Sequence, residues 1–163
     1  MTRDEVIARL KESRAVFDER LAAVPHEALA LPVPGSTHSA KDIVAHVTAY
    51  DDLIVQRLVE SRHGRTTAFD RDRDGWESFN GRVWVEAGGL GPDEVIDRAR
   101  RVFAALLDEV GRLTDAELAA PVGATAALDP TWLEGRAPWE MIGVDAFDHY
   151  PMHYEVMRTA CRA

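Results

Sequence analysis

The sequence is poor in cysteine and in long hydrophobic runs. Cys161 is the only cysteine among 163 residues, so no intramolecular disulfide can stabilise the fold, and its place near the C-terminus suggests no catalytic role. No stretch approaches the roughly 18 consecutive apolar residues of a membrane span. The first ten residues are charged and lack the apolar core of a signal peptide. We therefore expect a cytoplasmic protein without a membrane partner.

Positive charge is also in short supply. Lys and Arg number 19 and Asp and Glu number 28, which gives a net charge of -9. A chain with this balance repels phosphate backbones and anionic membrane surfaces. On this basis we expect no nucleic-acid partner. The small-molecule substrate that we expect instead follows from the histidines and the resemblance described below.

The length and composition suit one domain. With 163 residues and 46% hydrophobic content, the chain can bury about two-thirds of its unfolded surface. We expect a single domain that spans residues 1–163.

Apolar residues recur at helical spacing in four segments, and prolines and glycines interrupt the pattern between them. The segments begin near Val6, Ser39, Pro92 and Pro138, and the first three end near Pro25, Arg62 and Thr114. Ser39 suits an N-cap, and the two prolines suit first helical positions. Residues 63–91 form a long connection with a short helix near 76–86. We predict an all-α fold, a four-helix bundle with a long crossover between helices two and three.

Three of the six histidines lie on predicted inward faces of helices. His46 falls on the apolar stripe of the second segment. His149 and His153 share the apolar face of the fourth segment, one helical turn apart. The other three, His26, His38 and His63, lie in loops or at helix ends.

The three inward histidines suit a divalent metal. Zinc, nickel and ferrous iron accept neutral imidazole nitrogens, and two histidines at i and i+4 can both reach one ion. Three protein ligands leave a position for water or substrate, as in catalytic zinc sites. The alternative is a set of core histidines that are hydrogen-bonded to carboxylates such as Asp42, Asp145 or Asp148.

Two further features surround this group. Pro151 lies between His149 and His153 and cannot donate a helical hydrogen bond, so the fourth helix should bend or widen there. Tyr50, Trp76 and Tyr150 are candidates for a pocket around the histidines, and Trp84, Trp132 and Trp139 could add to its wall. The alternative for these aromatic side chains is a place in the core.

The segments Ser39-Ala-Lys-Asp-Ile-Val-Ala-His46 and Asp148-His149-Tyr-Pro-Met-His153 resemble motifs of the DinB-like superfamily. The resemblance extends over nearly the whole chain. Its members include bacillithiol transferases and the N-terminal domain of mycothiol-dependent maleylpyruvate isomerase. The resemblance implies a four-helix bundle with a long crossover, in which a histidine of helix two and an H-x-x-x-H pair of helix four bind a divalent metal. The matching positions are His46, His149 and His153.

The segment Asp74-Gly-Trp76-Glu-Ser-Phe79-Asn80 is most similar to the ClbS/DfsB-like branch of that superfamily. The branch includes a cyclopropane hydrolase that protects its host from colibactin, and this chemistry need not use a metal. Where the branch commonly has Glu before the last histidine, this chain has Met152.

Three hypotheses for the function follow. The first is a metal-dependent enzyme in which His46, His149 and His153 hold zinc or nickel and activate water or a low-molecular-weight thiol against a small electrophile, for detoxification or group transfer. The second is a metal-free self-protection hydrolase or small-molecule-binding protein of the ClbS/DfsB type. The third is a non-catalytic helical bundle that acts as a homodimer.

Overall fold

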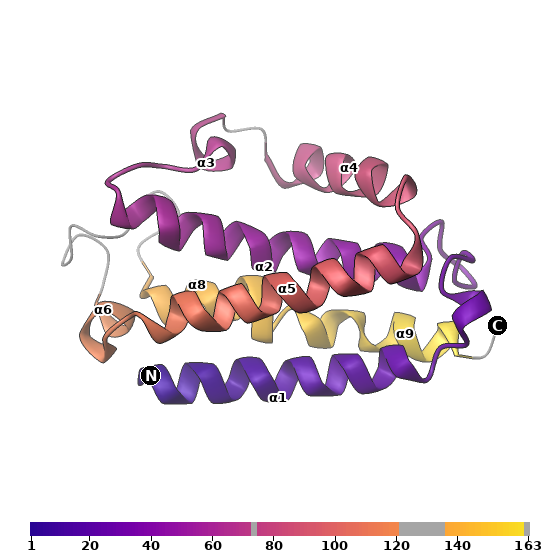
Figure 1. Cartoon of the computed structure of the whole chain (residues 1–163), viewed down its shortest axis with the longest axis horizontal. Helices are drawn as coiled ribbons and strands as arrows, with labels where there is room; N and C mark the ends of the chain where they lie inside the picture. Colours follow the sequence, from indigo (N-terminus) through magenta and orange to yellow (C-terminus); the bar gives the residue numbers. More distant parts are fainter. Residues whose placement is uncertain (73–74, 121–135, 162–163) are drawn as a thin grey trace.

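The computed structural model describes residues 1–72, 75–120 and 136–161, and these residues contain helices and no named strand. The prediction of an all-α fold is confirmed for this part of the chain. Four long parts lie side by side (Figure 1). They are α1 (Arg3–Ala22), α2 (Ala40–Arg62), α5 (Pro92–Gly111) and the C-terminal run that contains α8 (Pro138–Ile142) and α9 (Tyr154–Ala160). Short helices η1 (His26–Ala28) and α6 (Asp115–Ala119) follow α1 and α5.

Local sequence signals set the starts of the long helices. The side chain of Ser39 accepts a hydrogen bond from the backbone N–H of Asp42, whose carboxylate accepts one from the Ser39 N–H. This capping box satisfies two backbone donors that a helix start otherwise leaves unpaired. Pro92 and Pro138 occupy first-turn positions of α5 and α8, as predicted.

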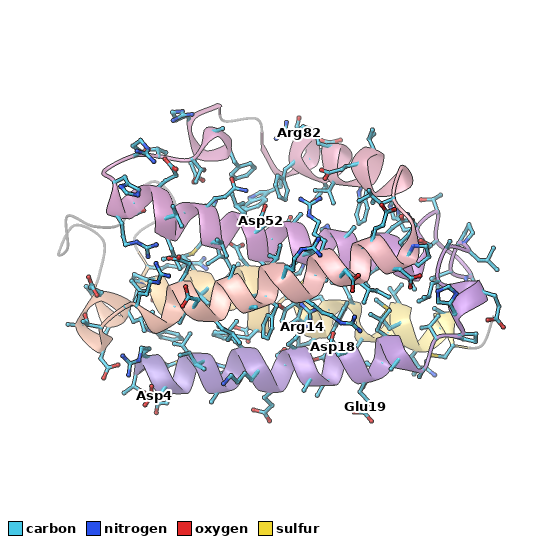
Figure 2. The ribbon with its side chains drawn as sticks, in the orientation of Figure 1. Asp4, Arg14, Asp18, Glu19, Asp52 and Arg82 are labelled. Carbon is cyan, nitrogen blue, oxygen red and sulfur yellow. The ribbon has the colours of Figure 1, made fainter. Side chains whose placement is uncertain are left out.

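Charged side chains of α1 are exposed on its outer face, whereas one arginine is buried on its inner face. Asp4 and Glu19 point away from the bundle, whereas Arg14 lies on the inner side towards α5 (Figure 2). The Arg14 guanidinium lies 5.0 Å from the centre of the Phe103 ring of α5. A buried arginine in this position needs partners, and Arg14 donates to Asp18 at 2.8 Å.

The described residues of the long crossover after α2 form two helices. α3 (Ala68–Asp72) and α4 (Gly75–Gly88) connect α2 to α5, and α4 lies along α2 (Figure 1). Gly64 has a φ of 66°, a left-handed conformation that suits glycine where the chain leaves α2. The crossover therefore covers one side of α2 with residues that are close in sequence to that helix.

The predicted fourth helix is not one regular helix. After α8 the chain forms a π-helical turn, η2 (Gly143–Phe147), and then a 3-10 turn, η3 (Tyr150–His153), before α9 begins. The Asp148 N–H donates to the Gly143 carbonyl at 2.9 Å, which spans five residues. Pro151 occupies the first turn of η3. The predicted widening is present, but it lies before Pro151, and the segment around Pro151 is narrower than an α-helix.

Apolar side chains from all four long parts fill the bundle in two clusters. One cluster includes Leu10, Leu58 and Ile142, and the other includes Phe17, Val44 and Met157. Among the described residues, no helix is long and apolar enough to cross a membrane. The two clusters hold α2 against the C-terminal run, and this contact positions the histidines.

Candidate metal centre

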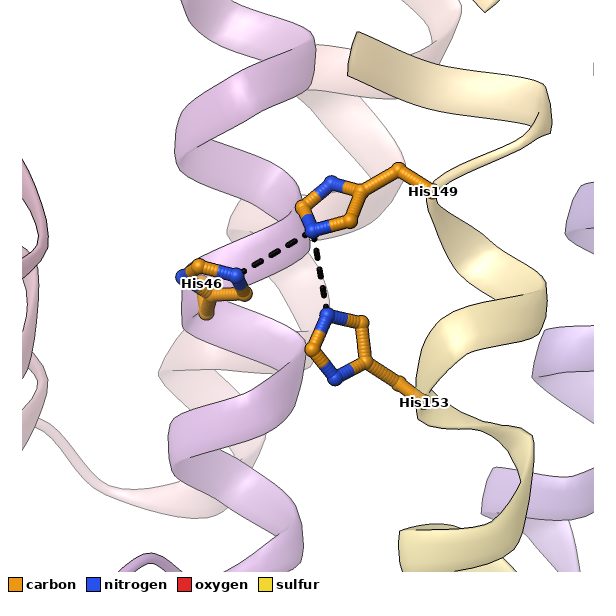
Figure 3. Close-up of side chains that lie close together, drawn as sticks. All are labelled: His46, His149 and His153. Carbon is orange, nitrogen blue, oxygen red and sulfur yellow. Dashed lines mark hydrogen bonds between the residues drawn. The ribbon is translucent and has the colours of Figure 1, made fainter. Parts of the chain in front are cut away.

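Three histidines from two distant parts of the chain meet where α2 faces the C-terminal run (Figure 3). His46 belongs to α2, His149 directly precedes η3 and His153 is its last residue. His149 Nε2 lies 3.2 Å from His46 Nε2 and 3.1 Å from His153 Nε2. One nitrogen of each ring lies within 4.8 Å of the other two. The structure thus brings together all three residues that the helical spacing singled out.

These three nitrogens cannot satisfy one another by hydrogen bonding alone. A nitrogen of a neutral imidazole carries either one proton or one lone pair in the ring plane, so it makes one well-directed hydrogen bond. His149 Nε2 nevertheless has two histidine nitrogens at contact distance. Tetrahedral zinc with Zn–N bonds of about 2.0–2.1 Å holds its nitrogen ligands roughly 3.3 Å apart. The two short separations are close to that value, and the third pair lies within 4.8 Å, so a small rotation of the His46 or His153 ring would let all three nitrogens bind one divalent ion.

Burial keeps all three imidazoles neutral near pH 7. It lowers the pKa of His46 to about 3 and that of His153 to about 4, and repulsion from the neighbouring histidines adds to the effect. Burial also lowers the pKa of His149, against the opposite influence of the Asp145 backbone carbonyl. Neutral imidazoles are the form that a metal requires. Among the described residues, Nδ1 of His46 and of His149 have no hydrogen-bond partner of normal geometry.

Aromatic side chains of the crossover lie against the histidines. Trp84 of α4 stacks on His46 with 4.8 Å between ring centres, and it also stacks on His38 at 4.1 Å. Further aromatic rings of α3 and α4 continue this layer towards Tyr50 of α2. We refer to four of these side chains as the aromatic cover: Phe69, Trp76, Phe79 and Trp84.

Two of the three predicted pocket residues lie beside the histidines. The edge of Tyr50 contacts His149 and His46, with ring centres 4.5 and 4.9 Å apart. Trp76 stacks on Tyr50 at 5.3 Å and is 41% exposed, so it lies at the outer edge of the group. The Tyr50 hydroxyl donates to Asn80 Oδ1 at 3.2 Å.

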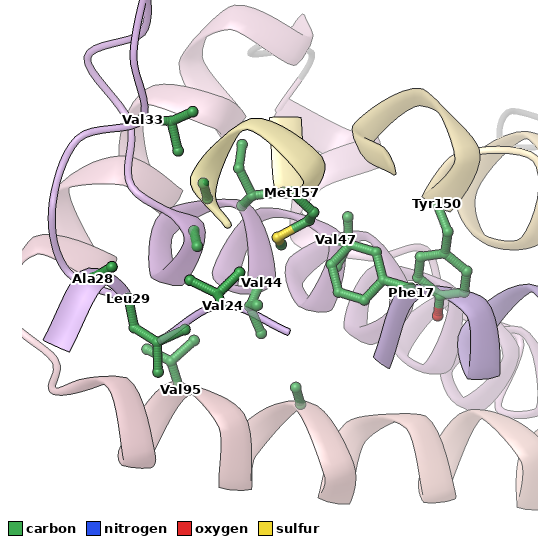
Figure 4. Close-up of a cluster of buried hydrophobic side chains, with 14 residues drawn as sticks. Phe17, Val24, Ala28, Leu29, Val33, Val44, Val47, Val95, Tyr150 and Met157 are labelled. Carbon is green, nitrogen blue, oxygen red and sulfur yellow. The ribbon is translucent and has the colours of Figure 1, made fainter. Parts of the chain in front are cut away.

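Tyr150, the third candidate, lies in the core instead. Its side chain is fully buried, and its ring packs 5.6 Å from that of Phe17 on α1 (Figure 4). Its hydroxyl donates to Asp51 Oδ2 at 2.6 Å. Tyr150 follows His149 directly in sequence but faces the α1 side of the bundle, because a turn points successive side chains in different directions.

The carboxylates that could have paired with the histidines have other partners. Asp42 caps α2, Asp145 accepts a hydrogen bond from Arg57, and Asp148 accepts one from Arg9. Met152, which replaces the glutamate common in the ClbS/DfsB-like branch, is 73% exposed. The described contacts therefore favour a group of histidines that face one another over histidines paired with acids.

Arg57 is a residue near the site that the sequence reasoning missed. It is 3% exposed and donates hydrogen bonds to Asp70 of α3 and Asp145 of η2. Arg57 follows Tyr50 by seven residues and His46 by eleven, so all three lie on one face of α2. A charged residue on an inward apolar face was the signal that could have identified it.

Two hollows formed by described residues have linings that do not include the three histidines, although one of them borders Phe69 and Phe79 of the aromatic cover. One of about 380 Å³ is lined by residues of α1, α2 and α5, and one of about 310 Å³ by residues of α2, α3, α4 and α5. Trp139 packs against the core. Trp132 and Asp74, which the sequence reasoning also named, lie outside the described residues.

Comparison with known proteins gives one family. The family model for the DinB superfamily matches residues 9–156. No curated protein matches the chain significantly in sequence.

Solved structures with the same fold share little sequence with the chain. An uncharacterised protein from Escherichia coli UTI89 is 15% identical, with a TM-score of 0.81 and coverage of 99% of this chain and 93% of that one. A protein from Streptococcus pneumoniae is 12% identical, with a TM-score of 0.79 and coverage of 97% and 89%. The colibactin self-resistance protein ClbS, solved in complex with double-stranded DNA, is 13% identical, with a TM-score of 0.80 and coverage of 96% and 93%.

The ClbS complex corrects one expectation from the sequence. The net charge of -9 led us to exclude a nucleic-acid partner, and that exclusion was wrong, since a protein of the same fold is seen with duplex DNA. The charge of a whole chain does not describe the local surface that meets a partner.

Proposed function

The chain belongs to the DinB superfamily, and from this membership and the geometry of the histidines we propose that it is a metal-dependent enzyme. His46, His149 and His153 hold one divalent ion, zinc or nickel. The observation that carries the proposal is the convergence of three Nε2 atoms, which hydrogen bonds among neutral rings cannot satisfy. The substrate is a small electrophile, and the reaction is a detoxification or a group transfer.

The protein's own residues prepare the site in three ways. The histidines supply three neutral nitrogens and leave at least one position open. Trp84 covers His46 and restricts water, and Tyr50 fixes the edges of His46 and His149. A divalent ion bound there would lower the pKa of a bound water or low-molecular-weight thiol and so supply a nucleophile near neutral pH.

The test is the metal content of protein purified without a histidine tag and then titrated with zinc and with nickel. We expect about one equivalent per chain for the parent protein and less than about a tenth for His153→Ala. His63→Gln is the control, because His63 is an exposed histidine at the end of α2. A parent protein that neither contains nor takes up either metal would refute the proposal.

The second candidate is a metal-free self-protection hydrolase or small-molecule-binding protein of the ClbS type. The fold shared with ClbS and the aromatic layer beside the histidines support it. If activity against a small electrophile persisted after the metal was removed by a chelator, this result would favour the second candidate. A titration with duplex DNA, monitored by fluorescence anisotropy, belongs to the same experiment because ClbS was solved with DNA.

A further inference from the structure

Arg57 forms a buried ionic contact between three parts of the chain. From α2, its Nη1 donates to Asp145 Oδ2 of η2 at 2.9 Å. Its Nε and Nη2 donate to the two carboxylate oxygens of Asp70 in α3, at 3.0 and 2.7 Å. The three side chains are no more than 5% exposed. One planar guanidinium therefore fixes the positions of α2, α3 and η2 relative to one another.

The contact has two arms, by which we mean the ion pair of Arg57 with Asp145 and its ion pair with Asp70. The Asp145 arm lies close in sequence to His149 of the candidate centre. Asp145 lies in the π-helical turn, four residues before His149, and the backbone N–H of His149 donates to the carbonyl of Ala146 in the same turn at 2.8 Å. A change in the position of Asp145 would therefore move or rotate His149. Partners of metal ligands commonly orient them in this way.

The Asp70 arm leads to the aromatic cover. Asp70 is held further by the Thr67 hydroxyl, which donates to its Oδ2 at 2.7 Å. The Arg57 guanidinium carbon lies 5.4 Å from the centre of the Phe69 ring and 5.8 Å from that of Trp76. Cation–π attraction at these distances adds to the ion pair. Arg57 thus contacts two members of the aromatic cover, which lies against Tyr50 and the histidines.

Folding alone gives little reason for this arrangement. Apolar side chains of similar volume often replace buried ion pairs without loss of stability, since charges are costly to remove from water. A forked cation between two carboxylates offers fixed geometry, which apolar contacts lack.

We propose that Arg57 is a positioning residue that couples the aromatic cover to the metal ligands. Through Asp145 it sets the orientation of His149, and through Asp70 it holds Phe69 and Trp76 in place. The inference rests on the proposed function and deepens it. It separates into two halves, one for each carboxylate.

The experiment measures Co²⁺ affinity from the visible absorption of the bound ion, and the position of the cover from the Trp76 indole N–H resonance, assigned with Trp76→Phe. Arg57→Lys keeps the charge but loses the fork, so we expect about a 10- to 100-fold loss of affinity and a shifted resonance. Asp145→Asn should lower the affinity and leave the resonance in place. Asp70→Asn should shift the resonance with a smaller loss of affinity.

Arg14→Lys is the matched control. Arg14 is 4% exposed, pairs with Asp18 and Asp51, and lies over the rings of Phe103 and Tyr150. Among the described contacts it touches neither Asp70 nor Asp145. The Arg14→Lys variant should lose stability in urea, as Arg57→Lys does, but its Co²⁺ affinity and its Trp76 indole N–H resonance should stay unchanged. If Arg57→Lys also changed only stability, Arg57 would be structural and the inference overturned.

The two proposals fail in different ways. A parent protein without Co²⁺ binding would overturn the proposed function and the ligand half of this inference. A Trp76 resonance that stays in place in Arg57→Lys would overturn the cover half, whatever the metal result.

Discussion

Burial moves the ionisable side chains of the bundle towards their neutral forms. It lowers the pKa of His46 and His153 to about 3 and about 4, and it raises that of Asp51 to about 7. For Asp51, burial outweighs the hydrogen bond from Tyr150 and the attraction of Arg14, both of which favour the carboxylate. The same physical cause therefore prepares the histidines for a metal and leaves an acid beside Tyr150 that gains its proton near neutrality.

Asp51 should make the protein less stable as the pH rises. The raised pKa means that the folded chain keeps the Asp51 proton up to about pH 7, whereas the unfolded chain loses it near the ordinary value of 3.8. The folded state binds more protons between these values, so the free energy of unfolding falls as pH rises from about 4 to 7, by up to about 4 kcal/mol. Asp51→Asn removes this contribution.

The measurement is urea unfolding of the parent and of Asp51→Asn at pH 5, 6, 7 and 8. The lowered pKa values of the histidines act in the opposite direction, because the unfolded chain protonates them first, but both proteins share that effect. The stability difference should shift in favour of Asp51→Asn as pH rises. A difference that is constant across the series would contradict the pKa of Asp51.

Among the elements, the C-terminal run departs most from a regular helix, and this departure positions two of the three histidines. Pro151 indicated an irregular segment, because proline lacks the N–H that a helix needs. The π-helical turn before it had no comparable signal. Gly143 allows that turn, since a Cβ there would lie 2.8 Å from two ring carbons of Phe147.

Gly143→Ala should therefore destabilise the protein by about 1–3 kcal/mol, because the Phe147 ring must move. It should also weaken metal binding, because η2 leads directly to His149. Urea unfolding and a zinc titration measure the two effects.

Gly81→Ala is the control for this prediction. Gly81 lies within α4, and a methyl group there would meet no atom within 4 Å beyond the backbone of its own helix, so alanine fits and favours the helix. The control should be neutral or more stable by up to about 1 kcal/mol. Equal behaviour of the two variants would show that the contact with Phe147 does not govern the π-helical turn.

For the molecule as a whole, the proposed metal links α2 to the C-terminal run and should stabilise the entire fold. The histidines come from positions about a hundred residues apart, so the ion would join distant parts of one domain. The single domain over residues 1–163, the cytoplasmic location and the dimer remain predictions.

Zinc or nickel at about 100 times its dissociation constant adds roughly 2.7 kcal/mol to the stability of a protein that binds it only when folded. For a chain of this size the unfolding temperature should rise by about 5–10 °C. His46→Ala should show no such rise. Circular dichroism and tryptophan fluorescence should report one coincident transition, and two separate transitions would contradict a single domain.

The sequence by itself determined the starts of the long helical segments and the inward positions of the three histidines, but not the irregular course of the C-terminal run. Ser39, Pro92 and Pro138 mark helix starts through local hydrogen bonding and backbone geometry, and helical spacing places His46, His149 and His153 on inward faces. Spacing cannot determine which inward residues meet across the bundle, because that depends on the packing of distant segments. Only the tertiary structure placed Tyr150 against Asp51 and Arg57 between Asp70 and Asp145. The same packing brought His46 within 3.2 Å of His149.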